Sequence, residues 1–204
     1  KQSGTEAIVA KLDQILDMPG DNPERITLGP VGVYQRDTVN ARDGYRSLKK
    51  WEETSGNRCR LVAIAAIYEP AVTFMAYARY KGETWVFSMP SNVAGKKMKA
   101  LLKEQGITDR VIATQIVPAL DSSLPVVAEA RKALGQNLDP VALEGYIVGK
   151  MFLAITLAID GPLTRENFLK AARRQPYDIG GGTAGFTTDN QGSDFVLVTS
   201  LKDG

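Results

Sequence analysis

Residues 61–82, LVAIAAIYEPAVTFMAYARYKG, contain two apolar segments with different spacing, and this difference decides the fold class. The segment from Arg60 to Ile67 is almost continuously apolar, which is typical of a strand covered on both faces of a parallel sheet. After Tyr68-Glu69-Pro70, apolar residues recur with the spacing of a helix, and Gly82 marks its end. The stretch therefore predicts a buried strand followed by a helix, with a tyrosine at the junction.

The same alternation continues on both sides of this stretch. Upstream, residues 26–34 (ITLGPVGVY) predict a strand, and a helix runs from Ala41 to Gly56. Downstream, residues 84–89 and 110–117 predict strands on either side of a helix over 95–105. The order strand, helix, strand, helix, strand, helix, strand is the signature of a parallel α/β sheet, which we expect to be doubly wound.

The last third of the chain predicts helices instead. The first has Ser122 or Ser123 as its N-terminal cap with Pro125 in its first turn, and a later one is capped by Thr164. Turn residues between two strand-like runs in 178–201 then predict an antiparallel strand pair at the end of the chain.

Between these helices lies the most apolar long segment, residues 141–159 (VALEGYIVGKMFLAITLAI). A membrane span would tolerate Glu144 and Lys150 poorly. We therefore expect a helix buried in a protein core and no direct insertion into a membrane.

Composition excludes several classes of function. The 204 residues include 25 Lys and Arg and 23 Asp and Glu, and these charges are scattered along the chain, so neither nucleic acid nor an anionic membrane surface is predicted as a partner. There is no histidine and one cysteine, which removes the usual zinc ligand sets, a histidine-based triad and an intrachain disulfide. We predict no enzyme activity, no metal and no cofactor.

Two smaller features each have a functional and a structural interpretation. Cys59, between Arg58 and Arg60, is either a strand-entry residue or an activated thiolate, and no base accompanies it. Gly180-Gly181-Gly182 lacks the spacing of a phosphate-binding loop and predicts a turn between strands.

Polar and aromatic side chains follow three of the predicted strands. In open parallel sheets ligands bind at the carboxyl ends of the strands, so these loops predict one rim of a binding site. The alternative is that the same residues cap helices and form turns. The candidate ligand-binding residues are Tyr34, Gln35, Asp37, Tyr68, Ser91 and Asn92.

Five segments, in this order, resemble the type I periplasmic solute-binding proteins of the branched-chain amino-acid (Leu/Ile/Val) group, which serve ABC import systems. They are VGVYQRDTVNARDGYRSL (31–48), IYEPAVTFMAYARYKG (67–82), TQIVPALDSSLPVVAEAR (114–131), VALEGYIVGKMFLAITLAIDGPLTRENFLKA (141–171) and DIGGGTAGFTTDNQGSDFVLVTSL (178–201). The last is the most specific, and TEAIVAKL (5–12) resembles the helix that precedes the second lobe.

The resemblance implies a division of the chain between two lobes. Residues 1–25 form a helix leading into the second lobe, and 26–117 form that α/β lobe. Residues 118–173 are a helical portion of the first lobe, and 174–204 are a hairpin that returns to the second. The family's opening strand–helix series is absent, and a short loop replaces one strand–helix unit between KKWEETSGN and RCRLVAIAAIY. We therefore expect the carboxyl-terminal part of a longer, extracytoplasmic protein.

The resemblance also implies a function. The family binds a small polar solute between two lobes and delivers it to a membrane permease. Tyr34 and Asp37 match its first-loop positions, Tyr68 matches a ring that packs on the solute, and Ser91 falls where some amino-acid binders have an acidic group. Two alternatives stay open: a ligand-sensing domain of a signalling receptor with this fold, and an enzyme on a doubly wound sheet.

Overall fold

The computed structural model describes residues 27–35, 38–90 and 95–201. The predicted helix within residues 1–25 lies outside these ranges, as do Asp37, Ser91 and Asn92. The chain divides into two compact units. Unit 1 comprises residues 1–88, 101–111 and 202–204, and unit 2 comprises residues 89–100 and 112–201.

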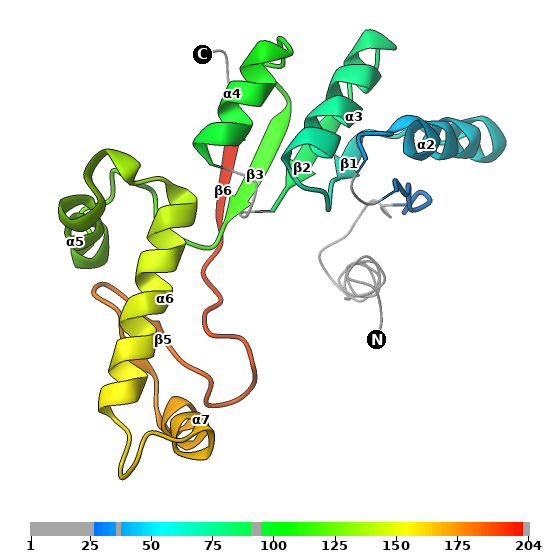
Figure 1. The fold of residues 1–204 in the computed structure, drawn as a ribbon. Coiled ribbons are helices and arrows are strands. Elements are labelled where there is room, and N and C mark those ends of the chain that lie inside the picture. Colours follow the sequence, from blue (N-terminus) through cyan, green and yellow to red (C-terminus); the bar gives the residue numbers. More distant parts are fainter. Residues whose placement is uncertain (1–26, 36–37, 91–94, 202–204) are drawn as a thin grey trace. The chain divides into compact units, whose positions relative to one another are not determined.

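A mostly parallel four-stranded sheet confirms the predicted α/β class (Figure 1). Its strand order is β1-β2-β3-β6. The strands are β1 (Leu61–Ala63), β2 (Val86–Met89), β3 (Val111–Gln115) and β6 (Leu197–Leu201). β1 pairs with β2 in parallel, with Val62 opposite Phe87.

The helices predicted before β1, between β1 and β2, and between β2 and β3 are also present. They are α2 (Arg42–Ser55), α3 (Tyr68–Tyr80) and α4 (Lys96–Glu104). α2 ends where Gly56 takes a left-handed conformation (φ 71°) and donates its backbone N–H to the Glu52 carbonyl oxygen. A glycine adopts this conformation without the steric cost that a Cβ would add.

Two predicted strands differ from the structure. Residues 27–35 have no regular secondary structure and are exposed, although ITLGPVGVY has the composition of a strand. β1 has three residues instead of the eight predicted, and Leu61 is 53% exposed. Both differences have one physical reason. A strand is stabilised by its neighbours, and β1 is an edge strand with a partner on one side only among the described residues.

The core of unit 1 is built from aromatic and large apolar side chains of α2, α3 and β2. Phe87 and Met75 are fully buried. Tyr45 packs edge-on against Tyr77 with ring centroids 5.1 Å apart, and Phe74 packs edge-on against Phe87 at 6.2 Å. Such pairs contribute beyond their buried area, so this cluster fixes how α2 and α3 pack in the unit.

In unit 2, α6 (Pro140–Leu157) packs on two other helices, α5 (Pro125–Leu134) and α7 (Arg165–Arg174). A short 3-10 helix, η2 (Gly135–Asn137), joins α5 to α6. Thr164 caps α7 as predicted, because its Oγ1 accepts a hydrogen bond from the Asn167 N–H at 3.2 Å. The cap predicted for α5 is wrong: Leu124 occupies the N-cap, and the Ser122 Oγ accepts from the Leu124 N–H in the preceding turn.

The predicted antiparallel pair is present as two short strands, β4 (Tyr177–Asp178) and β5 (Thr183–Ala184). The glycines of residues 180–182 form the turn between them, as the sequence predicts. A Cβ at Gly181 would lie 2.8 Å from Leu124 Cδ2, so this turn passes close to the beginning of α5. Close packing therefore accounts for that glycine without a ligand.

The prediction that residues 141–159 are buried in a core is wrong for one face of α6. Leu143 and Ile155 are buried, each in a separate cluster of unit 2. Phe152, Leu153 and Leu157 are 53%, 60% and 85% exposed. Among the described helices, α6 is long and apolar enough to cross a membrane, and 11% of it is buried inside the molecule.

Candidate functional site

The structure describes three of the six candidate ligand-binding residues: Tyr34, Gln35 and Tyr68. Tyr34 and Gln35 lie in the segment without regular structure, and Tyr34 is 37% exposed. The Gln35 carbonyl oxygen accepts from the Thr38 N–H at 3.2 Å and from its hydroxyl at 2.7 Å. These bonds hold a turn, which agrees with the alternative that the loop residues serve the backbone.

Tyr68 is the first residue of α3 and is half-buried. Four residues separate it from the end of β1, so it stands on the carboxyl side of that strand, as the sequence predicts. The neighbouring Ile67 carbonyl oxygen accepts from the Ala71 N–H at 3.1 Å, which begins the helix and fixes the backbone at Tyr68. Contact with a solute stays a prediction for all six residues.

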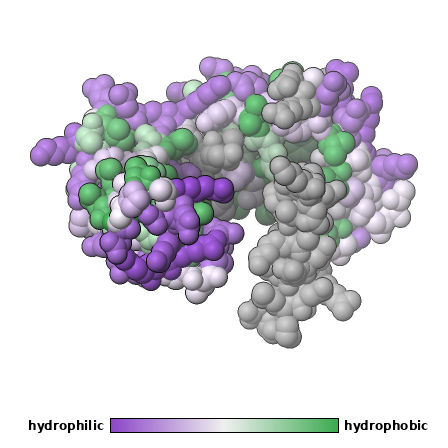
Figure 2. Space-filling model, turned by 60° about the horizontal axis from the view of Figure 1, so that its bottom comes forward, coloured by the Kyte–Doolittle hydropathy of each residue, from purple (hydrophilic) through white to green (hydrophobic). Residues whose placement is uncertain are grey.

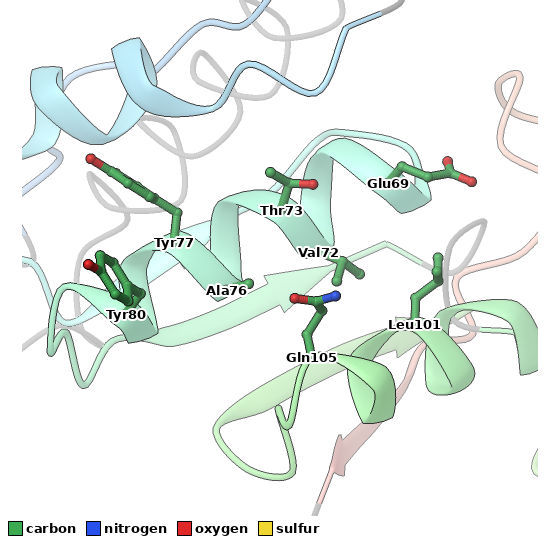
Figure 3. Close-up of a pocket in the computed structure, with 8 residues that line it drawn as sticks. All are labelled: Glu69, Val72, Thr73, Ala76, Tyr77, Tyr80, Leu101 and Gln105. Carbon is green, nitrogen blue, oxygen red and sulfur yellow. The ribbon is translucent and has the colours of Figure 1, made fainter.

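A groove of about 420 Å³ lies elsewhere in unit 1, between α3 and α4 (Figure 3). Its apolar surface comes from Val72 and Ala76 of α3 and Leu101 of α4, and Gln105, which directly follows α4, points toward Val72. The rest of its lining comes from α3: Glu69, Thr73, Tyr77 and Tyr80. Its lining thus combines apolar side chains with amide, hydroxyl and carboxylate groups.

Sequence reasoning missed this groove. The six lining residues that belong to α3 are spaced along the sequence as residues on one side of a helix are, so they share one face of α3. That spacing was available in the sequence, but it also fits a helix face packed in a core. The groove exists because α4 lies beside this face of α3, which the sequence does not specify. Tyr80, 82% exposed, stands at one end of the groove.

A polar cluster connects α2 to the loop before β2 within unit 1. The Tyr45 hydroxyl donates to Glu83 Oε1 at 2.7 Å, and Lys49 Nζ lies 3.0 Å from the same oxygen. Lys49 also pairs with Glu52. Burial, together with the hydrogen bond to Glu83, raises the pKa of Tyr45 to about 12.

Lys49 and Glu52 of this cluster are held in their charged forms. The hydrogen bond to Glu52 raises the pKa of Lys49 above its ordinary value. Burial acts to raise the pKa of Glu52, but hydrogen bonds from Lys49 and the Cys59 N–H, with the charges of Lys49 and Arg58, outweigh it and leave the pKa lowered. The cluster is internally paired, so it ties α2 to its neighbours and offers no free acid or base for catalysis.

Cys59 is a strand-entry residue and not an activated thiolate. Burial, with the carboxylates of Glu52 and Glu83, raises the pKa of the thiol to about 11. The Sγ donates weakly to the Leu61 carbonyl oxygen at 3.6 Å. Among the described residues no group of three or more Cys, Asp or Glu side chains is placed to hold a metal ion.

No protein-family model matches the sequence, and no curated protein sequence matches it either. Solved structures do match. A protein of Rhodopirellula baltica, described as a possible leucine/isoleucine/valine-binding protein, is 28% identical with a TM-score of 0.71, over 83% of this chain and 49% of its own. The chain has the fold of the branched-chain amino-acid binding proteins. The resemblance predicted from the sequence is confirmed at this level.

Two further structures of binding proteins have the same fold. An extracellular ligand-binding receptor from Verminephrobacter eiseniae is 21% identical with a TM-score of 0.73, over 98% of this chain and 56% of its own. A branched-chain amino-acid ABC transporter protein from Thermus thermophilus, with bound valine, is 11% identical with a TM-score of 0.55, over 100% of this chain and 65% of its own. These binding-protein relatives are not enzymes, and the chain spans about half the length of the first two.

Proposed function

We propose that the chain is part of an extracytoplasmic solute-binding protein of an ABC import system, and that its solute is an amino acid or a related small carboxylate. The match to the Rhodopirellula baltica protein carries this proposal, because it combines 28% identity with 83% coverage of the chain. The partner that follows from it is a membrane permease, and the location is outside the cytoplasm.

The proposed site is the carboxyl end of the sheet around Tyr68. There a half-buried ring beside the first turn of α3 can pack on the apolar part of a solute. Tyr34, Gln35, Asp37, Ser91 and Asn92 complete the proposed site with hydroxyl, amide and carboxylate groups. In the same proposal, residues 26–117 and 174–204 belong to one lobe and 118–173 to the other.

A second proposal is a ligand-sensing domain that changes the state of a signalling partner. The description of the Verminephrobacter eiseniae protein as a receptor favours it. Both proposals require solute binding, so a binding experiment does not separate them. Solute uptake in cells that carry the permease separates them, because only the transport component increases uptake.

A thermal-shift screen tests solute binding. A solute bound by the folded state alone raises the melting temperature in proportion to the logarithm of its concentration. We expect leucine, isoleucine, valine or a short carboxylate to raise it at millimolar concentration, and Tyr68→Ala to remove the shift. If none of these compounds raises the melting temperature, or if Tyr68→Ala leaves the shift unchanged, the proposed site is wrong.

A further inference from the structure

The outward side of α3 carries almost no charge, although hydrophilic residues cover much of the surface shown in Figure 2. Of its two charged residues, Glu69 stands in the first turn, and Arg79 donates to the Glu83 carbonyl oxygen at 2.9 Å and lies over the Phe87 ring. A surface helix normally turns charged side chains outward. The neighbouring α2 does so with Arg42, Asp43, Arg46, Lys50 and Glu53. The outward side of α3 therefore has the character of a surface that another molecule covers.

The residues on this outward side are low in the middle of the helix and high at one end. They are Glu69, Thr73, Ala76 and Tyr80, which recur every three or four positions, and none of them is buried. We call this set the α3 ridge. Thr73 and Ala76 are small, whereas the Tyr80 ring is 82% exposed at the end of the helix (Figure 3). The small residues allow a close approach to the middle of α3, and the exposed ring projects beside it.

The groove between α3 and α4 runs along this ridge and suits a ring like that of Tyr80. Val72 and Leu101 supply apolar contacts, and the Gln105 amide can bond a phenolic hydroxyl. Tyr80 does not fill the groove of its own chain, because most of its side chain is exposed. The same surface therefore offers a projecting aromatic ring and, next to it, a hollow of about 420 Å³ that matches such a ring.

The two ends of the ridge carry opposite charges. Lys81 directly follows α3, and its Nζ lies 5.5 Å and 5.6 Å from the ring centroids of Tyr77 and Tyr80. Glu69 stands at the other end of α3 (Figure 3). A two-fold axis through the middle of the ridge would bring Glu69 of one copy opposite Lys81 of a second copy, at both ends. A carboxylate accepts several hydrogen bonds, so Glu69 can meet this lysine in addition to an interaction within its own chain.

We propose that two copies of the chain pair through the α3 ridge with two-fold symmetry, so that Tyr80 of each copy lies in the groove of the other. A second copy is the occupant that fits, because one surface supplies the ring, the hollow and both charges, and antiparallel helices also oppose their dipoles favourably. The 13 residues of α3 extend over about 20 Å, which makes a small interface, so the dimer is reversible. The inference goes beyond the proposed function and does not depend on which solute is bound.

Sedimentation velocity of the whole chain without solute, at concentrations from micromolar to submillimolar, tests the proposal. We expect a monomer–dimer equilibrium, and Tyr80→Glu should weaken the dimer at least tenfold, because a buried aromatic anchor is lost. Leu157→Glu is the matched control, since Leu157 is the last residue of α6 as Tyr80 is of α3, and it is 85% exposed. It should leave the dimer unchanged. Far-ultraviolet circular dichroism checks that both variants fold.

A charge exchange between copies tests the two-fold arrangement itself. Glu69→Lys and Lys81→Glu should each weaken self-association at least about fivefold, because like charges then meet at both ends of the ridge. An equimolar mixture of the two variants should dimerise as the unsubstituted chain does, because opposite charges meet again at both ends.

Three results overturn the proposal: a chain that stays monomeric at every concentration, a dimer that Leu157→Glu weakens as much as Tyr80→Glu, and a mixture of the charge variants that stays monomeric. A failed solute screen leaves the proposal untouched, because association is measured without solute.

Discussion

At the scale of single residues, the hydrogen bond from the Tyr45 hydroxyl to Glu83 has the clearest energetic consequence. Tyr45 is 9% exposed, and its hydroxyl donates to Glu83 Oε1 at 2.7 Å. Tyr45→Phe should lower the free energy of unfolding by about 1 kcal/mol at pH 7, because a buried hydrogen bond is lost and Glu83 keeps Lys49 as its partner. Chemical denaturation measures this, and Tyr80→Phe, at an 82% exposed ring, is the matched control. An equal effect of both substitutions would contradict the assignment.

The same hydroxyl predicts an alkaline loss of stability. The folded-state pKa of Tyr45 is raised from 10.0 to about 12, so folding favours the neutral phenol. Its contribution is complete below pH 10 and is lost as the pH rises through 12. Tyr45→Phe should therefore make the pH dependence of stability shallower in this window. Lys49, whose pKa is also raised, accounts for part of the remaining slope.

Cys59 gives a second residue-scale prediction. With a thiol pKa of about 11 instead of 9.0, its alkylation at pH 8 should be slower than that of an ordinary thiol by on the order of 100-fold, because the thiolate is the reactive form. Glu52→Gln removes a nearby negative charge, so it should lower the thiol pKa and speed alkylation. A fast reaction in the unsubstituted chain would restore the activated-thiolate alternative.

At the scale of elements, the approach of residues 27–35 to α2 depends on a glycine. A Cβ at Gly32 would lie 3.0 Å from the Gly44 Cα, which is backbone and cannot rotate away. Gly32→Ala should therefore destabilise unit 1 by about 1–2 kcal/mol. Gly29→Ala is the control, because its Cβ would sit 3.5 Å from the Trp51 ring, an ordinary contact. Thermal unfolding compares the two, and equal melting temperatures would show that the segment does not pack on α2 in solution.

The same segment shows what sequence could and could not predict. The alternation around residues 61–82 was predicted because helical and strand periods are local properties of a chain. VGVY at 31–34 has strand composition, yet it remains without a ladder, because pairing depends on a neighbour that local composition does not specify. The exposure of α6 and the groove between α3 and α4 likewise depend on which elements meet. The position of Tyr68 at the start of a helix was predicted because a strand-to-helix junction is itself local, while its contact with a solute stays a prediction.

At the scale of the whole molecule, two places are candidates for the proposed solute site. One is the carboxyl end of the sheet at Tyr68, and the other is the groove between α3 and α4, which ends at Tyr80. These tyrosines occupy the first and last positions of the same helix, 13 residues long. The fold match favours the first place, since ligands of open α/β sheets bind at the carboxyl ends of the strands.

Paired substitutions at these tyrosines decide between the two places. If the solute packs on Tyr68, Tyr68→Ala should weaken its binding by at least about 1 kcal/mol, while Tyr80→Ala changes it by less than a few tenths. Isothermal titration with the solute identified by the thermal-shift screen measures both. Hydrogen exchange of α3 is the control for folding, because an alanine in the first turn can also loosen the helix. If Tyr80→Ala weakens binding and Tyr68→Ala does not, the binding site is the groove. If Tyr68→Ala lowers the exchange protection of α3 and leaves the affinity unchanged, Tyr68 is a packing residue.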